Sequence, residues 1–217
     1  DPDTYARDQK RFNDWFIKKE QNRKNAGFAL LPRLITEYGF TGAKDVKYGT
    51  NYASAYTAAA IRQMITSPPT AAFAFQPKDG PGQEKGDGWG FITHETNGKR
   101  FKPRYHVFSF IDKMAGNRID LKGEGSWVTG FASTKDNILR ILLVNFDQRG
   151  THTEAVPLTI ANLKPGTYNY KEAFLQGKEN IFKETVIEDE DKITRLTKKI
   201  LLPAQSVMII KLAKICC

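Results

Sequence analysis

The sequence has few residues of the kinds that bind metals or cross-link a chain. Its only cysteines are the last two of 217 residues, Cys216 and Cys217, and its three histidines, His94, His106 and His152, are scattered. Adjacent cysteines at a chain end cannot cross-link a core, and no zinc-ligand spacing occurs. The sequence therefore predicts no metal site and no cofactor, and we expect a disordered tail.

Long apolar runs are also absent. No stretch approaches the length of a membrane span. The polar start, residues 1–4, has neither an initiator methionine nor the apolar segment of a signal peptide. We expect this start to lie inside a longer sequence.

Acidic residues are fewer than basic ones, 24 against 33, which gives a formal charge of +9. The excess is spread along the chain and forms no basic tract, which favours a solvated basic surface and predicts no nucleic-acid partner. A nucleic-acid-binding protein is a third interpretation. It rests on charge alone and predicts strongly salt-dependent binding to DNA or RNA.

Residues 1–116 show the pattern of an α/β protein. Apolar and aromatic side chains at helical spacing predict helices over residues 4–25, 50–66 and 103–115. Short apolar runs predict two strands buried on both faces, over residues 28–37 and 70–76.

Glu37 stands out because it closes the first of these strands. In barrels of helix-covered strands, the chemistry lies at the carboxyl ends of the strands. A buried carboxylate costs several kcal/mol unless it is paired or hydrogen-bonded. Position alone leaves two interpretations open, a functional carboxylate and a solvated loop glutamate.

From residue 117 the sequence changes to short strands separated by Gly, Pro and Asn turns. Strands are predicted over residues 118–122, 127–133, 138–146, 153–160, 167–174, 192–201 and 206–212. Even spacing of this kind indicates an antiparallel sandwich or barrel. Residues 180–187 give no clear prediction.

Three short motifs carry a family resemblance. Residues 35–39, Ile-Thr-Glu-Tyr-Gly, resemble the nucleophile strand of the clan A glycoside hydrolases, and most closely family 39, the β-xylosidases and relatives, where this strand ends Thr-Glu-Trp-Gly. Residues 89–93, Trp-Gly-Phe-Ile-Thr, are followed by a turn and by Lys102-Pro103, as in the family's Gly-Leu-x-Thr, Gly and Lys-Pro segment. Residues 202–207, Leu-Pro-Ala-Gln-Ser-Val, resemble the closing strand of sandwich domains appended to clan A barrels.

The resemblance implies a multidomain fold, α/β followed by all-β. Residues 1–116 are expected to be the last units of a (β/α)8 TIM barrel, helix six and units seven and eight, and residues 117–217 an antiparallel β-sandwich. Two strands cannot close a barrel, so an N-terminal barrel portion is expected as a partner, either a second chain or a missing segment. Family relatives are often secreted or cell-surface proteins, and this assigns no location here.

The same resemblance implies a retaining glycosidase with Glu37 as nucleophile. Trp89, Phe75, Tyr38 and Asp79 are predicted to contact the carbohydrate substrate, because aromatic faces bind the apolar C–H face of a sugar. The alternative for Trp89 is a packing role at the barrel rim. The family's acid/base glutamate follows an asparagine, and no Asn-Glu pair occurs in this sequence.

A second function belongs to another class: a non-catalytic carbohydrate-binding or scaffold module with a degenerate barrel remnant. Phe75 falls where family 39 has a tryptophan that floors the subsite of the cleaved sugar. Phenylalanine lacks the indole N–H and offers a smaller stacking face, which favours the remnant. Glu37 favours the enzyme.

Overall fold

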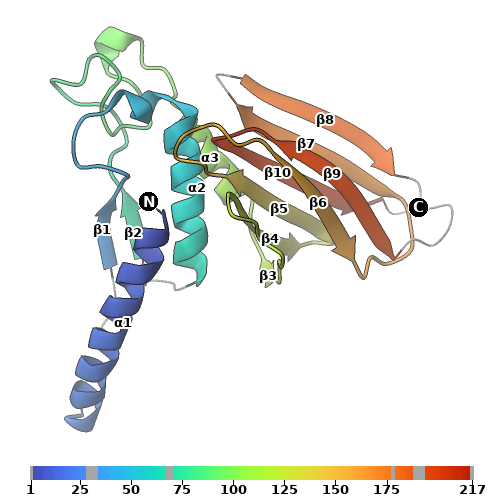
Figure 1. Cartoon of the computed structure of the whole chain (residues 1–217), viewed down its shortest axis with the longest axis horizontal. Helices are drawn as coiled ribbons and strands as arrows, with labels where there is room; N and C mark the ends of the chain where they lie inside the picture. Colours follow the sequence, from blue (N-terminus) through green and yellow to red (C-terminus); the bar gives the residue numbers. More distant parts are fainter. Residues whose placement is uncertain (1, 28–33, 67–70, 177–178, 188–193, 216–217) are drawn as a thin grey trace.

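The structure is a computed structural model that describes residues 2–27, 34–66, 71–176, 179–187 and 194–215. Helices and strands alternate in the first half, and strands fill the second (Figure 1). The first-half elements are α1 (Pro2–Asn25), β1 (Leu34–Tyr38), α2 (Asn51–Thr66), β2 (Ala71–Ala74) and α3 (Pro103–Asp112). The second-half elements are β3 (Asn117–Ile119), β4 (Val128–Lys135), β5 (Ile138–Asn145), β6 (Glu154–Ala161), β7 (Tyr168–Gln176), β8 (Glu179–Ile187), β9 (Arg195–Leu202) and β10 (Ser206–Lys214).

The strands β1 and β2 pair in parallel, with α2 as the crossover between them. Parallel pairing requires such a crossover, because a tight turn can only reverse the chain. The helix packs closely because one of its sides is built of small residues, and Ala53, Ala55 and Ala58 have no exposed surface. The predicted strand–helix–strand order of this region is confirmed.

The strands of the second half form two antiparallel sheets, as the turn spacing predicts. The larger has the order β3-β4-β5-β10-β7-β8, and the smaller contains β6 and β9. The strand β8 is the element that the sequence left undecided. It pairs with β7 along its whole length. Its sequence mixes charged and apolar residues on both alternating faces, which hides the period of two.

The larger sheet is buried on both faces by different partners. Ile141 and Leu143 face β6 and β9 within one hydrophobic cluster. Leu142 and Val144 face the opposite way and cluster with side chains of α2 and α3. Alternate residues of a strand point to opposite faces, so the continuous apolar run in β5 fits a central strand covered on both sides.

This packing joins the two halves through one core. In the second cluster, Ala55 of α2 and Val107 and Phe110 of α3 lie with Val207 and Ile209 of β10. The predicted division at residues 116 and 117 marks the change from helix to strand, but the hydrophobic core continues across it. The helices that frame β1 and β2 are therefore held by the sandwich.

The β1–β2 pair is less buried than predicted. Leu34 is 54% exposed and Phe73 is 56% exposed, although both lie in strands expected to be covered on two faces. Only two strands form this sheet in the described part of the chain, so each of them has one edge without a strand neighbour there. Residues 28–33, the start of the predicted first strand, lie outside the described residues, as do Cys216 and Cys217.

The helix α1 confirms the helix predicted over residues 4–25. Two of its apolar side chains are largely exposed, Trp15 at 55% and Ile17 at 65%. Figure 1 shows that much of the helix extends beyond the other elements.

A truncation in the shared core tests whether it is continuous. Leu142→Ala should lower the free energy of unfolding by about 2–5 kcal/mol, because this leucine is fully buried between the sheet and the helices. Leu201→Ala is the control at a position 63% exposed in β9, and should change it by no more than about 0.5 kcal/mol. Urea denaturation followed by circular dichroism measures both. Equal losses in the two variants would contradict the shared core.

Candidate active site

The carboxyl ends of β1 and β2 bring Glu37 and Phe75 to the same edge of the small sheet. Tyr38, which follows Glu37, pairs with Ala74, which precedes Phe75. Parallel strands end at one edge, so the register places both residues there. The Glu37 side chain is exposed, and no described residue bonds to its carboxylate. Its side chain is accessible from solvent.

Two aromatic rings lie beside this edge. The ring centroids of Phe75 and Trp89 are 5.8 Å apart with an interplanar angle of 57°. Phe75 is 42% exposed, and Trp89 and Tyr38 are partly buried. Phe75 is joined to Gln76 by a cis peptide bond. Phe75 thus presents exposed ring surface at the same sheet edge as Glu37.

Arg104 lies beneath this edge and is 1% exposed. Its Nη2 donates to the carbonyl oxygen of Tyr38 at 3.2 Å, and its Nη1 donates to the carbonyl oxygens of Phe75 at 2.9 Å and Trp89 at 3.2 Å. Its Nε donates to Oγ1 of Thr57 at 3.1 Å. One guanidinium thus bonds to three of the residues predicted to contact substrate.

Aromatic rings complete the surroundings of Arg104. Its guanidinium carbon lies 5.0 Å from the ring centroid of Phe91 and 5.9 Å from those of Tyr38 and Tyr48. No carboxylate among the described residues lies within ion-pair distance of it. Burial lowers the pKa of Arg104, but arginine stays protonated in proteins. The strand ends therefore sit over a buried positive charge.

The loop that carries Trp89 is held by a second buried cation. Nζ of Lys102 lies 2.6 Å from Oδ2 of Asp79, and the two side chains are 2% and 0% exposed. Nζ also donates to the carbonyl oxygen of Gly88 at 2.9 Å, and Oδ1 of Asp79 accepts from the N–H of Gly90 at 2.8 Å. Burial lowers the pKa of Lys102, while Asp79 acts in the opposite direction. These contacts fix the chain on both sides of Trp89.

Two glycines make this close packing feasible. A Cβ on Gly90 would lie 2.2 Å from the backbone nitrogen of Asp79, and one on Gly88 would lie 2.5 Å from Cδ of Gln83. Both distances are far below contact distance, so no larger residue fits without moving the loop. The amide of Gln83 also accepts from the N–H of Gly80 at 2.8 Å.

The structure thus brings Glu37, Tyr38, Phe75 and Trp89 together at one edge. Asp79 differs from these four residues because it has no exposed surface. Its carboxylate is bonded to Lys102 and Gly90. Sequence reasoning missed Arg104, because an arginine in an amphipathic helix is normally solvated. The Lys102-Pro103 motif singled out Lys102, but it did not predict the ion pair with Asp79.

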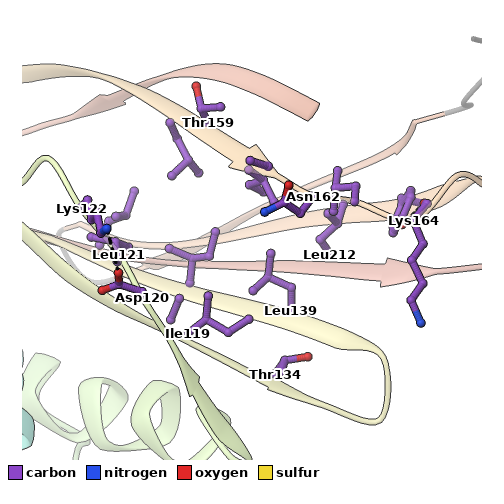
Figure 2. Close-up of a pocket in the computed structure, with 18 of the residues that line it drawn as sticks. Ile119, Asp120, Leu121, Lys122, Thr134, Leu139, Thr159, Asn162, Lys164 and Leu212 are labelled. Atoms are coloured by element: carbon purple, nitrogen blue, oxygen red, sulfur yellow. Dashed lines mark hydrogen bonds and ion pairs between the residues drawn. The ribbon is translucent and has the colours of Figure 1, made fainter. Parts of the chain in front are cut away.

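A cavity of about 1230 Å³ lies elsewhere, between the two sheets of the sandwich. Figure 2 shows Ile119, Leu139 and Leu212 turned into it, with Lys122 and Lys164 at its two ends. Its walls are mainly aliphatic, and Tyr168 is the aromatic residue among them. Sugars need polar partners and aromatic faces, so this cavity is poorly suited to a sugar.

Two other kinds of site were sought in the described parts of the chain. Among those residues, no cluster of three or more His, Cys, Asp and Glu is arranged to hold a metal ion. None of the described helices is long and apolar enough to cross a membrane.

No protein-family model and no curated protein matches the sequence, whereas solved structures match the fold. A monomeric beta-xylosidase from Caulobacter crescentus CB15 matches with a TM-score of 0.74 and 16% identity over 100% of this chain and 51% of its own. A glucosidase from Croceicoccus marinus matches with a TM-score of 0.72 and 16% identity over 98% and 52%. A GH39 enzyme from Xanthomonas axonopodis pv. citri matches with a TM-score of 0.67 and 11% identity over 87% and 46%.

The fold is shared with glycoside hydrolases. The predicted resemblance to family 39 is confirmed at the level of the fold. The chain spans about half the length of the glycoside hydrolases that it matches. At these identities the likeness concerns architecture, and the chemistry has to be argued from the residues at the strand ends.

Breaking the buried ion pair tests its hold on the Trp89 loop. Lys102→Met should lower the free energy of unfolding by about 3–5 kcal/mol, because it leaves the Asp79 carboxylate buried without its partner. Lys78→Met removes a pair with Glu95 in which both side chains are more than 40% exposed, and should leave stability nearly unchanged. Thermal unfolding monitored by calorimetry compares the two. A small effect of Lys102→Met would show that the pair is dispensable.

Proposed function

We propose that this chain is part of a retaining glycoside hydrolase in which Glu37 is the nucleophile. The observation that carries the proposal is the exposed Glu37 at the carboxyl end of β1, on the sheet edge that also carries Phe75 and its ring partner Trp89. The fold shared with a beta-xylosidase, a glucosidase and a GH39 enzyme supports it. The substrate class is a glycoside, and the reaction is hydrolysis of its O-glycosyl bond.

The reaction proceeds in two displacements. In the first, a carboxylate oxygen of Glu37 attacks the anomeric carbon, the bond to the leaving oxygen breaks, and an acid/base carboxyl gives that oxygen a proton. In the second, the same carboxyl takes a proton from water, and the water oxygen displaces Glu37. The rings of Phe75 and Trp89 lie where they can receive the apolar face of the sugar, and Tyr38 adjoins them.

The acid/base group is proposed to come from a part of the barrel outside this chain. Retaining enzymes hold their two carboxyls about 5–5.5 Å apart, and the Asn-Glu pair that carries the family's acid/base group does not occur in this sequence. Leu34 and Phe73 are about half exposed, which supports an incomplete sheet. An open strand edge has unpaired N–H and C=O groups that can pair with a further strand. In this proposal, β1 and β2 are strands seven and eight of a (β/α)8 barrel, and the N-terminal portion is either a second chain or a segment of a longer one.

Asp79 takes a different role in the proposed enzyme from the predicted sugar contact. With no exposed surface, it acts through the loop by holding Gly88 and Gly90 on either side of Trp89. The indole of Trp89 also supports a site that is completed by groups outside the described residues. Its buried Nε1–H has no acceptor among the described residues, and leaving such a donor unsatisfied costs about 1–3 kcal/mol.

One observation favours the second candidate, a non-catalytic carbohydrate-binding or scaffold module. Phe75 stands where family 39 is expected to have tryptophan, and its smaller face weakens stacking on a sugar. The module and the enzyme share sugar binding but differ in covalent chemistry. Formation of a glycosyl–Glu37 bond therefore separates them.

Covalent trapping tests the proposed nucleophile. A dinitrophenyl 2-deoxy-2-fluoro-xyloside or -glucoside needs no proton for its leaving group, so its reaction with the nucleophile does not depend on the acid/base carboxyl. The protein, with the barrel portion supplied, should gain the mass of one fluoroglycosyl group, and peptide mapping should place it on Glu37. Glu37→Gln should abolish the labelling.

The matched control is Glu95→Gln, which changes another exposed glutamate and should be labelled like the unaltered protein. Labelling at a different residue would rule out Glu37 as nucleophile. Binding of the sugar without any label, seen by calorimetry in both the unaltered protein and Glu37→Gln, would support the binding module.

A further inference from the structure

We propose that Arg104 is a positioning residue that sets the distance between the nucleophile strand and the aromatic rings at the site. This inference rests on the proposed function for its catalytic part, and on geometry alone for its structural part. Arg104 is the only buried arginine among the described residues. It comes from α3, and its three carbonyl partners come from β1, the end of β2 and the Trp89 loop.

The shape of the guanidinium explains how one side chain can set this spacing. Its N–H groups are fixed in a plane at fixed angles. Because Nη1 bridges the carbonyl oxygens of Phe75 and Trp89 while Nη2 bonds to that of Tyr38, the three carbonyls are held at the spacing of the fork. Lysine has a single nitrogen and cannot hold three acceptors in this planar arrangement.

Arg104 is a buried cation whose hydrogen-bond acceptors are Thr57 and the carbonyl groups at the strand ends and the Trp89 loop. Its partners are neutral oxygens and ring faces, and no described carboxylate offsets its charge. A charge is costly to bury without a counter-ion, and an aliphatic side chain would fill the same space without that cost. The hydrogen bonds to the strand ends are therefore what the arginine supplies beyond packing.

Arg104 can affect the reaction through its hydrogen bond to Tyr38, the residue next to the proposed nucleophile. Tyr38 directly follows Glu37 in β1, so the position of the Tyr38 carbonyl fixes the backbone that carries the carboxylate. A displacement of about 1 Å at a reacting group can cost about 100-fold in rate. Releasing the Tyr38, Phe75 and Trp89 carbonyls together should move the nucleophile and both rings relative to each other.

The first test needs no activity. In a background with Trp15→Phe and Trp127→Phe, Trp89 is the only tryptophan of the chain. Arg104→Lys and Arg104→Met should shift its emission to longer wavelength and raise its quenching by acrylamide, because the loop loses its tie to α3. Arg62→Met is the control, since it removes the guanidinium that α2 directs to Glu124, and it should leave the emission unchanged. Unchanged emission in both Arg104 variants would overturn the proposal.

The second test measures the rate of labelling by the fluoroglycoside. Arg104→Lys should slow it by about 100-fold, while its melting temperature falls no more than that of Arg62→Met. A loss of rate equal to that of Arg62→Met would overturn the catalytic part, because a purely structural residue changes the rate only through stability. If the unaltered protein takes no label, the proposed function fails, and the Trp89 emission still decides whether Arg104 positions the loop.

A milder variant covers a failure of the Arg104 variants to fold. Thr57→Val removes only the acceptor of Nε, in a residue that is 2% exposed. It should slow labelling by about 2- to 10-fold, the effect of one hydrogen bond, and shift Trp89 emission in the same direction as Arg104→Lys. No change in either quantity would contradict the proposal.

Discussion

Burial of the larger sheet on both of its faces is the constraint on which the rest of the structure depends. The central strands β5 and β10 are apolar at nearly every position, and neither face can be left to water. One face is covered by β6 and β9, and the other by α2 and α3. Packing on this sheet therefore fixes the positions of α2 and α3. The strands β1 and β2, which α2 connects, are positioned with them.

The helix α3 connects this buried core with the ends of β1 and β2. Val107 and Phe110 pack on the sheet, and Arg104 lies one turn earlier on the same stripe of the helix. Anchoring the two apolar residues leaves the guanidinium under the carbonyl oxygens of Tyr38, Phe75 and Trp89. The candidate site is therefore tied to a core that contains none of its residues.

Sequence patterns predicted the elements well where the apolar pattern was unambiguous, as in the helical spacing of α2 and the continuous apolar runs of β5 and β10. They failed where burial depended on distant partners. Phe73 has the apolar side chain of a core residue and lies in a strand predicted to be buried on both faces, yet it is 56% exposed. Glu37 could be predicted as a site residue because it ends a strand in a recognisable motif. Arg104 could not, since its burial depends on carbonyl groups from three segments that only the fold brings together.

The shared core also bears on how such a protein could be recombined. Gly116, at the change from helix to strand, has a positive φ of 97°, and a Cβ there would lie 2.2 Å from the carbonyl oxygen of Thr134. A junction at this point looks like a natural place to exchange sandwich domains between enzymes. The apolar contacts of α2 and α3 with β5 and β10 cross that junction, so a transplanted sandwich would have to match the donor's helices. The two halves are therefore expected to be inherited as a pair.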